Sequence, residues 1–179
     1  MTTQAERLIE CLWPQGAASG QEVFAVLDGA RSRRIAPWIR LRTLEYECLF
    51  RGDLSPRLSD AAPYVVHLKR DDGFTSELLE RAWSRAWGIF TRVPDGVSLE
   101  RHRRHLRTLL RVKDESGRKL VFRFYDPRVL RVYLPTCTGD EAQTFFGPLP
   151  EILAESEDGG SLLSYRPARD GVTMQRVAV

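Results

Sequence analysis

Cysteine is scarce in this chain, and its scarcity excludes several classes of protein. The 179 residues include only three cysteines, Cys11, Cys48 and Cys137, which are far apart and form no CxxC pair. An odd number of isolated cysteines matches neither a disulfide framework nor a four-cysteine zinc site. We therefore predict three reduced thiols in the core of a cytoplasmic protein.

Long apolar runs and a strong excess of one charge are also missing. No apolar run approaches the roughly 20 residues of a membrane-spanning helix, and residues 1–7 lack the basic and then apolar order of a signal peptide. The 27 basic and 24 acidic residues give a net charge of +3. This charge is too small to require nucleic acid or an anionic membrane as a partner, so we expect neither.

Catalytic and cofactor-binding motifs are absent as well. There is no GxSxG elbow, no P-loop and no GxGxxG sequence. His102 and His105 have i, i+3 spacing near Glu100, but neither an HExxH order nor a cysteine pair completes a metal site. His67 lies in an apolar run and is interpreted as a core histidine. We expect no catalytic, metal-binding or cofactor-binding residues and no cofactor, although missing motifs leave an enzyme as an open alternative.

Hydrophobic periodicity predicts alternating helices and strands, and hence an α/β (α+β) fold. The expected helices cover residues 5–13, 35–41, 76–87, 98–111, 127–134 and 138–146, and residues 51–61 are expected to form a loop. The expected strands cover residues 23–27, 44–50, 64–68, 89–93 and 119–125, with an edge strand at 162–165. We predict a mixed sheet lobe with flanking helices in residues 1–125. A small helical lobe with a mobile tail from Pro167 follows in residues 126–179.

The segment around Asp126 joins a strand signal directly to a helix signal. Apolar residues alternate up to Phe124, Asp126 can cap a helix, and Pro127 fits the first helical position. Arg123 and Arg128 flank this junction, and charges there are costly to bury unless they are paired. Asp126, Pro127 and Arg128 therefore form either a structural latch or part of a recognition site.

This junction also carries a family resemblance. The run from Leu106 to Pro150, which contains the sequence FRFYDPRVL, resembles the core of the bacterial type VI secretion adaptor-chaperones. Shorter matches lie upstream in the expected order, at residues 25–30, 62–68 and 87–90. The resemblance implies a non-catalytic cytoplasmic protein that binds a toxic secreted effector. It also implies that the protein helps to load the effector onto the secretion spike, so that the effector and a spike-tip protein would be its partners.

A basic helix offers a second candidate surface. Placing residues 98–111 on a helix aligns three arginines in one stripe at i, i+4 and i+8: Arg103, Arg107 and Arg111. The stripe could bind an acidic protein surface or nucleic-acid phosphate, or it could be a solvated face paired with local carboxylates such as Glu100, Asp114 and Glu115. An acidic protein surface is favoured over nucleic acid because no aromatic residues are interleaved with the stripe. A basic nucleic-acid-binding domain is the alternative function.

Aromatic residues suggest where a partner chain would bind. A protein that holds another chain needs an exposed apolar groove with aromatic and arginine anchors. Phe145, Phe146 and Leu149 are the candidates, because two adjacent helical residues cannot both face the same core position. Arg123 and Tyr125 share a strand face and could border the groove. We expect a shallow apolar groove between the sheet and the 138–146 helix.

Overall fold

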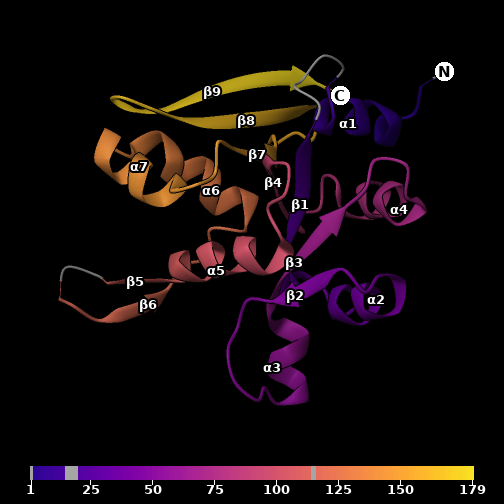
Figure 1. The fold of residues 1–179 in the computed structure, drawn as a ribbon, viewed down its shortest axis with the longest axis horizontal. Coiled ribbons are helices and arrows are strands. Elements are labelled where there is room, and N and C mark those ends of the chain that lie inside the picture. Colours follow the sequence, from indigo (N-terminus) through magenta and orange to yellow (C-terminus); the bar gives the residue numbers. More distant parts are fainter. Residues whose placement is uncertain (1, 15–19, 114–115) are drawn as a thin grey trace.

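The computed structural model describes residues 2–14, 20–113 and 116–179. Helices and strands alternate along these residues, which confirms the α+β class (Figure 1). The helices are α1 (Gln4–Leu12), α2 (Ile35–Arg42), α3 (Pro56–Ala61), α4 (Gly73–Ala82), α5 (Leu99–Leu109), α6 (Pro127–Tyr133) and α7 (Gly139–Phe146), with short 3-10 helices η1 (Gly29–Arg31) and η2 (Leu134–Thr136). The strands are β1 (Gln21–Asp28), β2 (Tyr46–Cys48), β3 (Pro63–Leu68), β4 (Gly88–Pro94), β5 (Arg111–Lys113), β6 (Lys119–Val121), β7 (Glu151–Glu155), β8 (Ser161–Ala168) and β9 (Gly171–Ala178).

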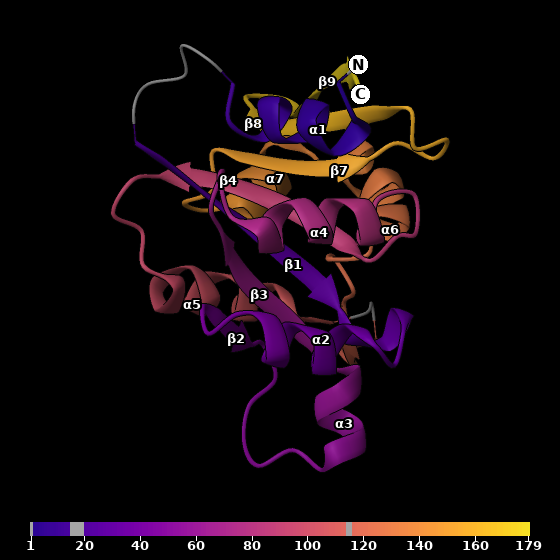
Figure 2. The same ribbon diagram turned by 90° about the vertical axis from the view of Figure 1, so that its right-hand side faces the viewer.

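Seven strands form one sheet in the order β2-β3-β1-β4-β7-β8-β9, and β5 and β6 form a separate hairpin. The sheet was expected to be mixed, but every pair of neighbouring strands among the described residues is antiparallel. Figure 2 shows β7, β8 and β9 at one end of the molecule and α3 at the other. No helix in the described ranges has the length and apolar character needed to cross a membrane.

The central strand β1 is buried on both faces, which explains its continuous apolar run. Phe24 and Val26 belong to a core shared with α5, α6 and α7. Val23, Ala25 and Leu27 belong to a second core shared with α1, α2 and α4. Helices therefore cover both faces of the sheet, with α5, α6 and α7 on one side of β1 and α2 and α4 on the other (Figure 1).

The prediction of a helical lobe with a mobile tail is wrong for residues 151–178. These residues form β7, β8 and β9, and β7 lies between β4 and β8 in the main sheet. β7 is buried on both faces and shows no alternation, and its first residue, Glu151, is a charged residue buried beside Arg92 and Arg166. β9 is largely exposed, begins at Gly171 and follows Pro167, so it had the appearance of a tail in the sequence. The sheet thus contains strands from both sides of the boundary expected at residue 125, and a division into two domains there stays a prediction.

Other element boundaries also differ from the predicted ones. The helix predicted at 98–111 ends at Leu109, and the strand predicted at 119–125 ends at Val121. The helix predicted at 76–87 ends at Ala82. The loop predicted at 51–61 contains α3, which begins with Pro56 in its first turn and is capped by the hydroxyl of Ser55.

His102 is a buried residue of α5 that faces the sheet. We expect it to make the stability of the fold depend on pH. Its ring stacks on Phe24 with centroids 4.6 Å apart, and its Nε2 lies 2.8 Å from the hydroxyl oxygen of Thr91. Burial lowers the pKa of His102 to about 3, and the nearby charge of His105 acts in the same direction. The folded protein therefore keeps this ring neutral, whereas the unfolded chain takes up a proton near pH 6.5.

We predict that the contribution of His102 to stability is complete above about pH 6.5 and falls as the pH falls toward about 3. His102→Gln keeps a hydrogen-bonding partner for Thr91 but does not titrate. Between pH 6.5 and pH 5, the free energy of unfolding should therefore fall by about 2 kcal/mol less in the variant than in the wild type. Urea unfolding at both pH values measures the difference, and equal losses in the two proteins would contradict the assignment.

Candidate partner-binding site

The turn between β6 and α6 contains a buried carboxylate that caps the helix. Oδ1 of Asp126 accepts a hydrogen bond from the backbone N–H of Arg128 at 3.0 Å. The guanidinium of Arg128 donates to both carboxylate oxygens of Asp126, at 3.0 and 2.7 Å. The cap predicted at Asp126, with Pro127 in the first turn, is confirmed.

Arg123 links this turn to the end of β1. Its guanidinium pairs with the carboxylate of Asp28, which is fully buried and also accepts the backbone N–H of Ala30 at 3.0 Å. The same guanidinium lies 3.9 Å from the carboxylate of Asp126. We call Asp28, Arg123, Asp126 and Arg128 the junction network. It joins residues 25–30 to the FRFYDPRVL segment, so two stretches that carry the family resemblance meet in space.

The chain leaves β1 through a position that only glycine can occupy. A Cβ atom at Gly29 would lie 2.4 Å from the carbonyl oxygen of Asp60 and 2.5 Å from that of Ala62. Neither oxygen belongs to a flexible side chain, so any larger residue would push α3 and the start of β3 away from η1. The segment that follows Asp28 is therefore fixed by close packing as well as by the hydrogen bond to Ala30.

The aromatic residues predicted to contact a partner are mostly buried. Tyr125 is 3% exposed and Phe146 is fully buried, so the exposed position expected for Phe146 is wrong. Burial raises the pKa of the Tyr125 hydroxyl to about 12, and the nearby charge of Asp28 adds to the effect. Leu149 is buried as well. Two adjacent helical residues can both be buried here because α7 packs in a shared core that continues onto β7 and β8.

Phe145, although buried, lines an open cavity of about 340 Å³. The cavity lies between the end of α5, β5 and α7, and its aromatic wall is a trio of mutually packed rings, Phe122, Tyr133 and Phe145. The other lining residues come from the α5–β5 side, with Thr108, Leu109, Arg111 and Val112, and from α7, with Asp140, Glu141 and Thr144. We call this the apolar groove.

The sequence pattern pointed to α7 but missed the opposite wall of the groove. Val112 is 40% exposed and belongs to the β5–β6 hairpin, which was expected to include the end of a helix. Two more apolar residues of the same hairpin, Leu120 and Val121, are also exposed. The available sequence signal for this wall was Val112, which follows the basic helix and precedes the Ser116-Gly117 turn.

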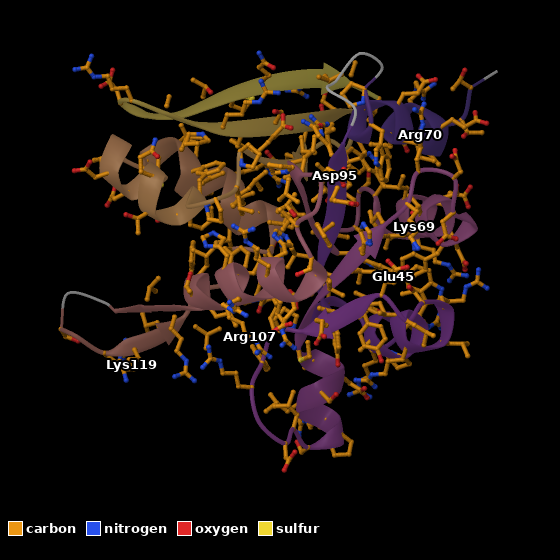
Figure 3. The ribbon with its side chains drawn as sticks, viewed as in Figure 1. Glu45, Lys69, Arg70, Asp95, Arg107 and Lys119 are labelled. Carbon is orange, nitrogen blue, oxygen red and sulfur yellow. The ribbon has the colours of Figure 1, made fainter. Side chains whose placement is uncertain are left out.

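The predicted arginine stripe does not form a free helix face. Arg103 pairs with Glu47 on β2. Arg107 donates to the backbone carbonyls of Cys48, Leu49 and Phe50 at 2.9 to 3.0 Å, and it points from α5 toward that segment (Figure 3).

The third member of the stripe, Arg111, lies outside the helix, in β5. The guanidinium of Arg107 is held within the fold, and burial lowers its pKa. Leu106 and Leu110 are buried beneath the helix as predicted. The expectation that all three arginines face solvent is therefore wrong, because Arg103 pairs with Glu47 of β2 and Arg107 binds the carbonyls of residues 48–50. Their contact with a partner stays a prediction.

Titratable groups elsewhere do not gather into a metal site. Within the described ranges, no group of three or more histidine, cysteine or acidic side chains could hold a metal ion. His67 lies between two carboxylates, with Nδ1 2.6 Å from Glu45 and Nε2 2.6 Å from Glu22, so its ring nitrogens are already occupied. Burial lowers the pKa of His105.

A family model described as Domain of unknown function (DUF4123) matches residues 23–144, which is more than half of the chain. No curated protein and no solved structure matches the chain. The matched region contains the whole junction network and ends within α7. Strands β7, β8 and β9 lie beyond it.

We predict that Asp126→Ala lowers the stability of the protein by about 2 kcal/mol, since it removes a helix cap and a charge-assisted hydrogen bond that water partly screens. The melting temperature should fall by about 4–8 °C. Asp126→Asn retains an acceptor for the cap and should lose less than half as much. Thermal unfolding of both variants at pH 7 tests this, and an unchanged melting temperature for Asp126→Ala would contradict it.

A second prediction distinguishes Arg107 from a surface arginine. Arg107→Ala leaves three backbone carbonyls without their donor and should cost about 2 kcal/mol of stability. Arg104, on the same helix, is 74% exposed and pairs only with Glu100, so Arg104→Ala should change stability by less than about 0.5 kcal/mol. Chemical denaturation of both variants measures the difference. Equal stability of the two variants would show that the contacts of Arg107 are dispensable.

Proposed function

This chain belongs to the family described as Domain of unknown function (DUF4123), and from that membership we propose that it is a non-catalytic adaptor-chaperone. In this proposal the protein binds a type VI secretion effector in the cytoplasm and helps to load it onto the tip of the secretion spike. The resemblance of the FRFYDPRVL segment to the adaptor-chaperones supplies the effector and the spike-tip protein as partners.

The apolar groove is the single observation that carries the proposal. A groove of about 340 Å³ with three packed rings on one wall offers a partner chain apolar surface that is already in place. Burying apolar surface in such a groove releases about 25 cal/mol per Å² before the costs of ordering. The occupant that fits best is an apolar effector segment flanked by charged side chains, because the groove is also lined by Arg111 from β5 and by Asp140 and Glu141 from α7.

The junction network is connected through the chain to two residues of the groove wall. Phe122 precedes Arg123 directly, and Tyr133 lies on α6, the helix that Asp126 caps. The positions of two of the three rings in the groove wall, Phe122 and Tyr133, therefore depend on this turn. In this arrangement the charged residues of the FRFYDPRVL segment do not contact the partner, but they position the aromatic rings that would.

Nucleic-acid binding through Arg103, Arg107 and Arg111 remains the alternative. Two of these guanidinium groups already have partners within the fold. A phosphate backbone would have to displace Glu47 and the carbonyl oxygens of residues 48–50. The geometry therefore favours a protein partner.

We predict that Val112→Asp weakens effector capture tenfold or more, because a carboxylate would enter an apolar groove that already has acidic residues at its rim. Val132→Asp is the matched control: Val132 is 73% exposed on α6 and does not line the groove. Both substitutions lie on the surface, so both variants should melt within about 2 °C of the wild type. Capture is measured with a purified effector encoded beside this protein.

Two outcomes would contradict different parts of the proposal. If both variants capture the effector as the wild type does, while the effector still aggregates without this protein, the groove is wrong but the function stands. If the effector is equally soluble with and without this protein and reaches the spike unaided, the adaptor-chaperone function itself is wrong.

A further inference from the structure

A second cavity lies on the other face of the sheet. It has a volume of about 310 Å³ and is lined by arginine and tryptophan residues from the segment before α2, from α2, from the end of α4 and from the segment that follows it: Ser32, Arg34, Trp38, Arg81, Arg85 and Trp87. Trp38 and Trp87 pack against the core that contains α1, α2 and α4, whereas the apolar groove opens from the core that contains α5 and α7. We call this the arginine–tryptophan cavity. It is independent of the proposed effector groove.

We propose that the arginine–tryptophan cavity binds a short acidic peptide segment that carries an aromatic side chain. The peptide carboxylates would pair with Arg34 and Arg85, and the aromatic side chain would pack on Trp38 and Trp87. The cavity volume is at the lower end of ligand sites, which suits one large side chain and its neighbours.

The tryptophans form a fixed apolar wall. Trp38 stacks on Phe74 with ring centroids 4.8 Å apart, and Trp87 meets Trp38 edge to face at 6.4 Å. The indole N–H of Trp38 donates to Glu77 at 3.3 Å. The indole N–H of Trp87 has no acceptor in the described part of the chain, so a donor remains at the cavity wall for a ligand oxygen.

The arginines of the cavity differ in how far the fold already uses them. Arg81 pairs with Glu77 and lies 5.7 Å from the centre of the Trp38 ring. Arg34 and Arg85 are exposed, and within the described ranges neither guanidinium has a hydrogen-bonding or ionic partner. Two unpaired guanidinium groups beside an aromatic wall are suited to carboxylate recognition.

The backbone that presents Arg85 is held in an unusual conformation. Its two neighbours, Ser84 and Ala86, have φ values of 61° and 53°, which non-glycine residues rarely adopt. The buried carboxylate of Glu155 accepts the backbone N–H groups of both, at 2.7 and 2.8 Å. Arg31 donates to the carbonyls of Arg85 and Ala86 from the other side, at 3.3 and 3.2 Å. Strain maintained by a dedicated buried carboxylate points to a functional position for the residue between.

The distribution of charge favours a short acidic peptide over nucleic acid. Glu77 contacts Trp38 and Arg81, two residues that line the cavity, and Glu80 is exposed on the same helix, α4. A continuous phosphate backbone crossing this surface would approach both carboxylates. One or two peptide carboxylates can instead reach Arg34 and Arg85 without doing so. Arg33 and Arg57, which line a neighbouring cavity with Asp60, extend the basic surface beyond η1.

The test is a titration of the ¹⁵N-labelled full chain with the peptide acetyl-Glu-Phe-Glu-amide, followed by the indole N–H signals in NMR spectra. We expect saturable shifts of the Trp38 and Trp87 signals, and at least tenfold weaker binding of acetyl-Gln-Phe-Gln-amide. The double variant Arg34→Gln/Arg85→Gln should lose at least tenfold in affinity for the acidic peptide. Arg101→Gln is the matched control, because Arg101 is exposed on α5, across the sheet.

Four results would overturn the proposal. They are equal binding of the acidic and neutral peptides, an equal effect of Arg101→Gln, saturation without any shift at Trp38 or Trp87, and tighter binding of ATP than of the acidic peptide. The last would replace the peptide with a phosphate ligand. Trp87→Leu, which keeps both arginines, should retain the preference for acidic peptide but weaken binding. The backbone N–H spectrum of each variant verifies that it is folded.

Discussion

A buried carboxylate needs hydrogen-bond donors for its oxygen atoms, and this requirement fixes the irregular segments at one end of the sheet. Asp28 receives the N–H of Ala30 and the guanidinium of Arg123. Glu155 receives the two N–H groups on either side of Arg85. Each carboxylate lies at the end of a regular strand: Asp28 caps the short helix η1, and Glu155 holds the turn that contains Arg85. Carboxylates at the ends of strands therefore hold the neighbouring segments in place by hydrogen bonds and an ion pair.

The two buried carboxylates are connected through the backbone. The N–H of Asp28 donates to the carbonyl of Trp87 at 2.7 Å, and Arg131 of α6 donates to the carbonyl of Glu155 at 2.9 Å. Gly88 allows the first of these contacts, because a Cβ atom there would lie 2.1 Å from the carbonyl oxygen of Val26. The FRFYDPRVL turn, the loop of Arg85 and the end of β1 consequently form one continuous piece of structure.

The sequence predicted the parts of this structure that are governed by local rules. Strand β1 and the cap at Asp126 follow from periodicity and from short-range hydrogen bonding, and both are present. β7 could not be predicted in this way, because Glu151 is buried only when Arg92 and Arg166 reach it from other strands.

The candidate sites show the same limit more strongly. The three arginines near α5 have ideal helical spacing, yet Arg107 binds carbonyl groups 57 to 59 positions away in the chain. The left-handed conformations on either side of Arg85 depend on a carboxylate that is about 70 residues away, since Glu155 is separated from Ser84 by 71 positions and from Ala86 by 69. Local spacing carries no information about such partners. Binding surfaces assembled by long-range charge pairing are therefore visible only in the fold.

The two proposed surfaces lie on opposite faces of one sheet, and this arrangement has a consequence for an adaptor. A protein that joins two partners needs surfaces that do not compete, and a sheet covered on both sides separates them physically. Both cavities are bounded by packed aromatic rings, so these rings lose little side-chain freedom when a partner binds. The apolar groove would then supply affinity through buried area, whereas the arginine–tryptophan cavity would supply selectivity through charge. The buried carboxylates line neither cavity, but they hold the segments beside them in place.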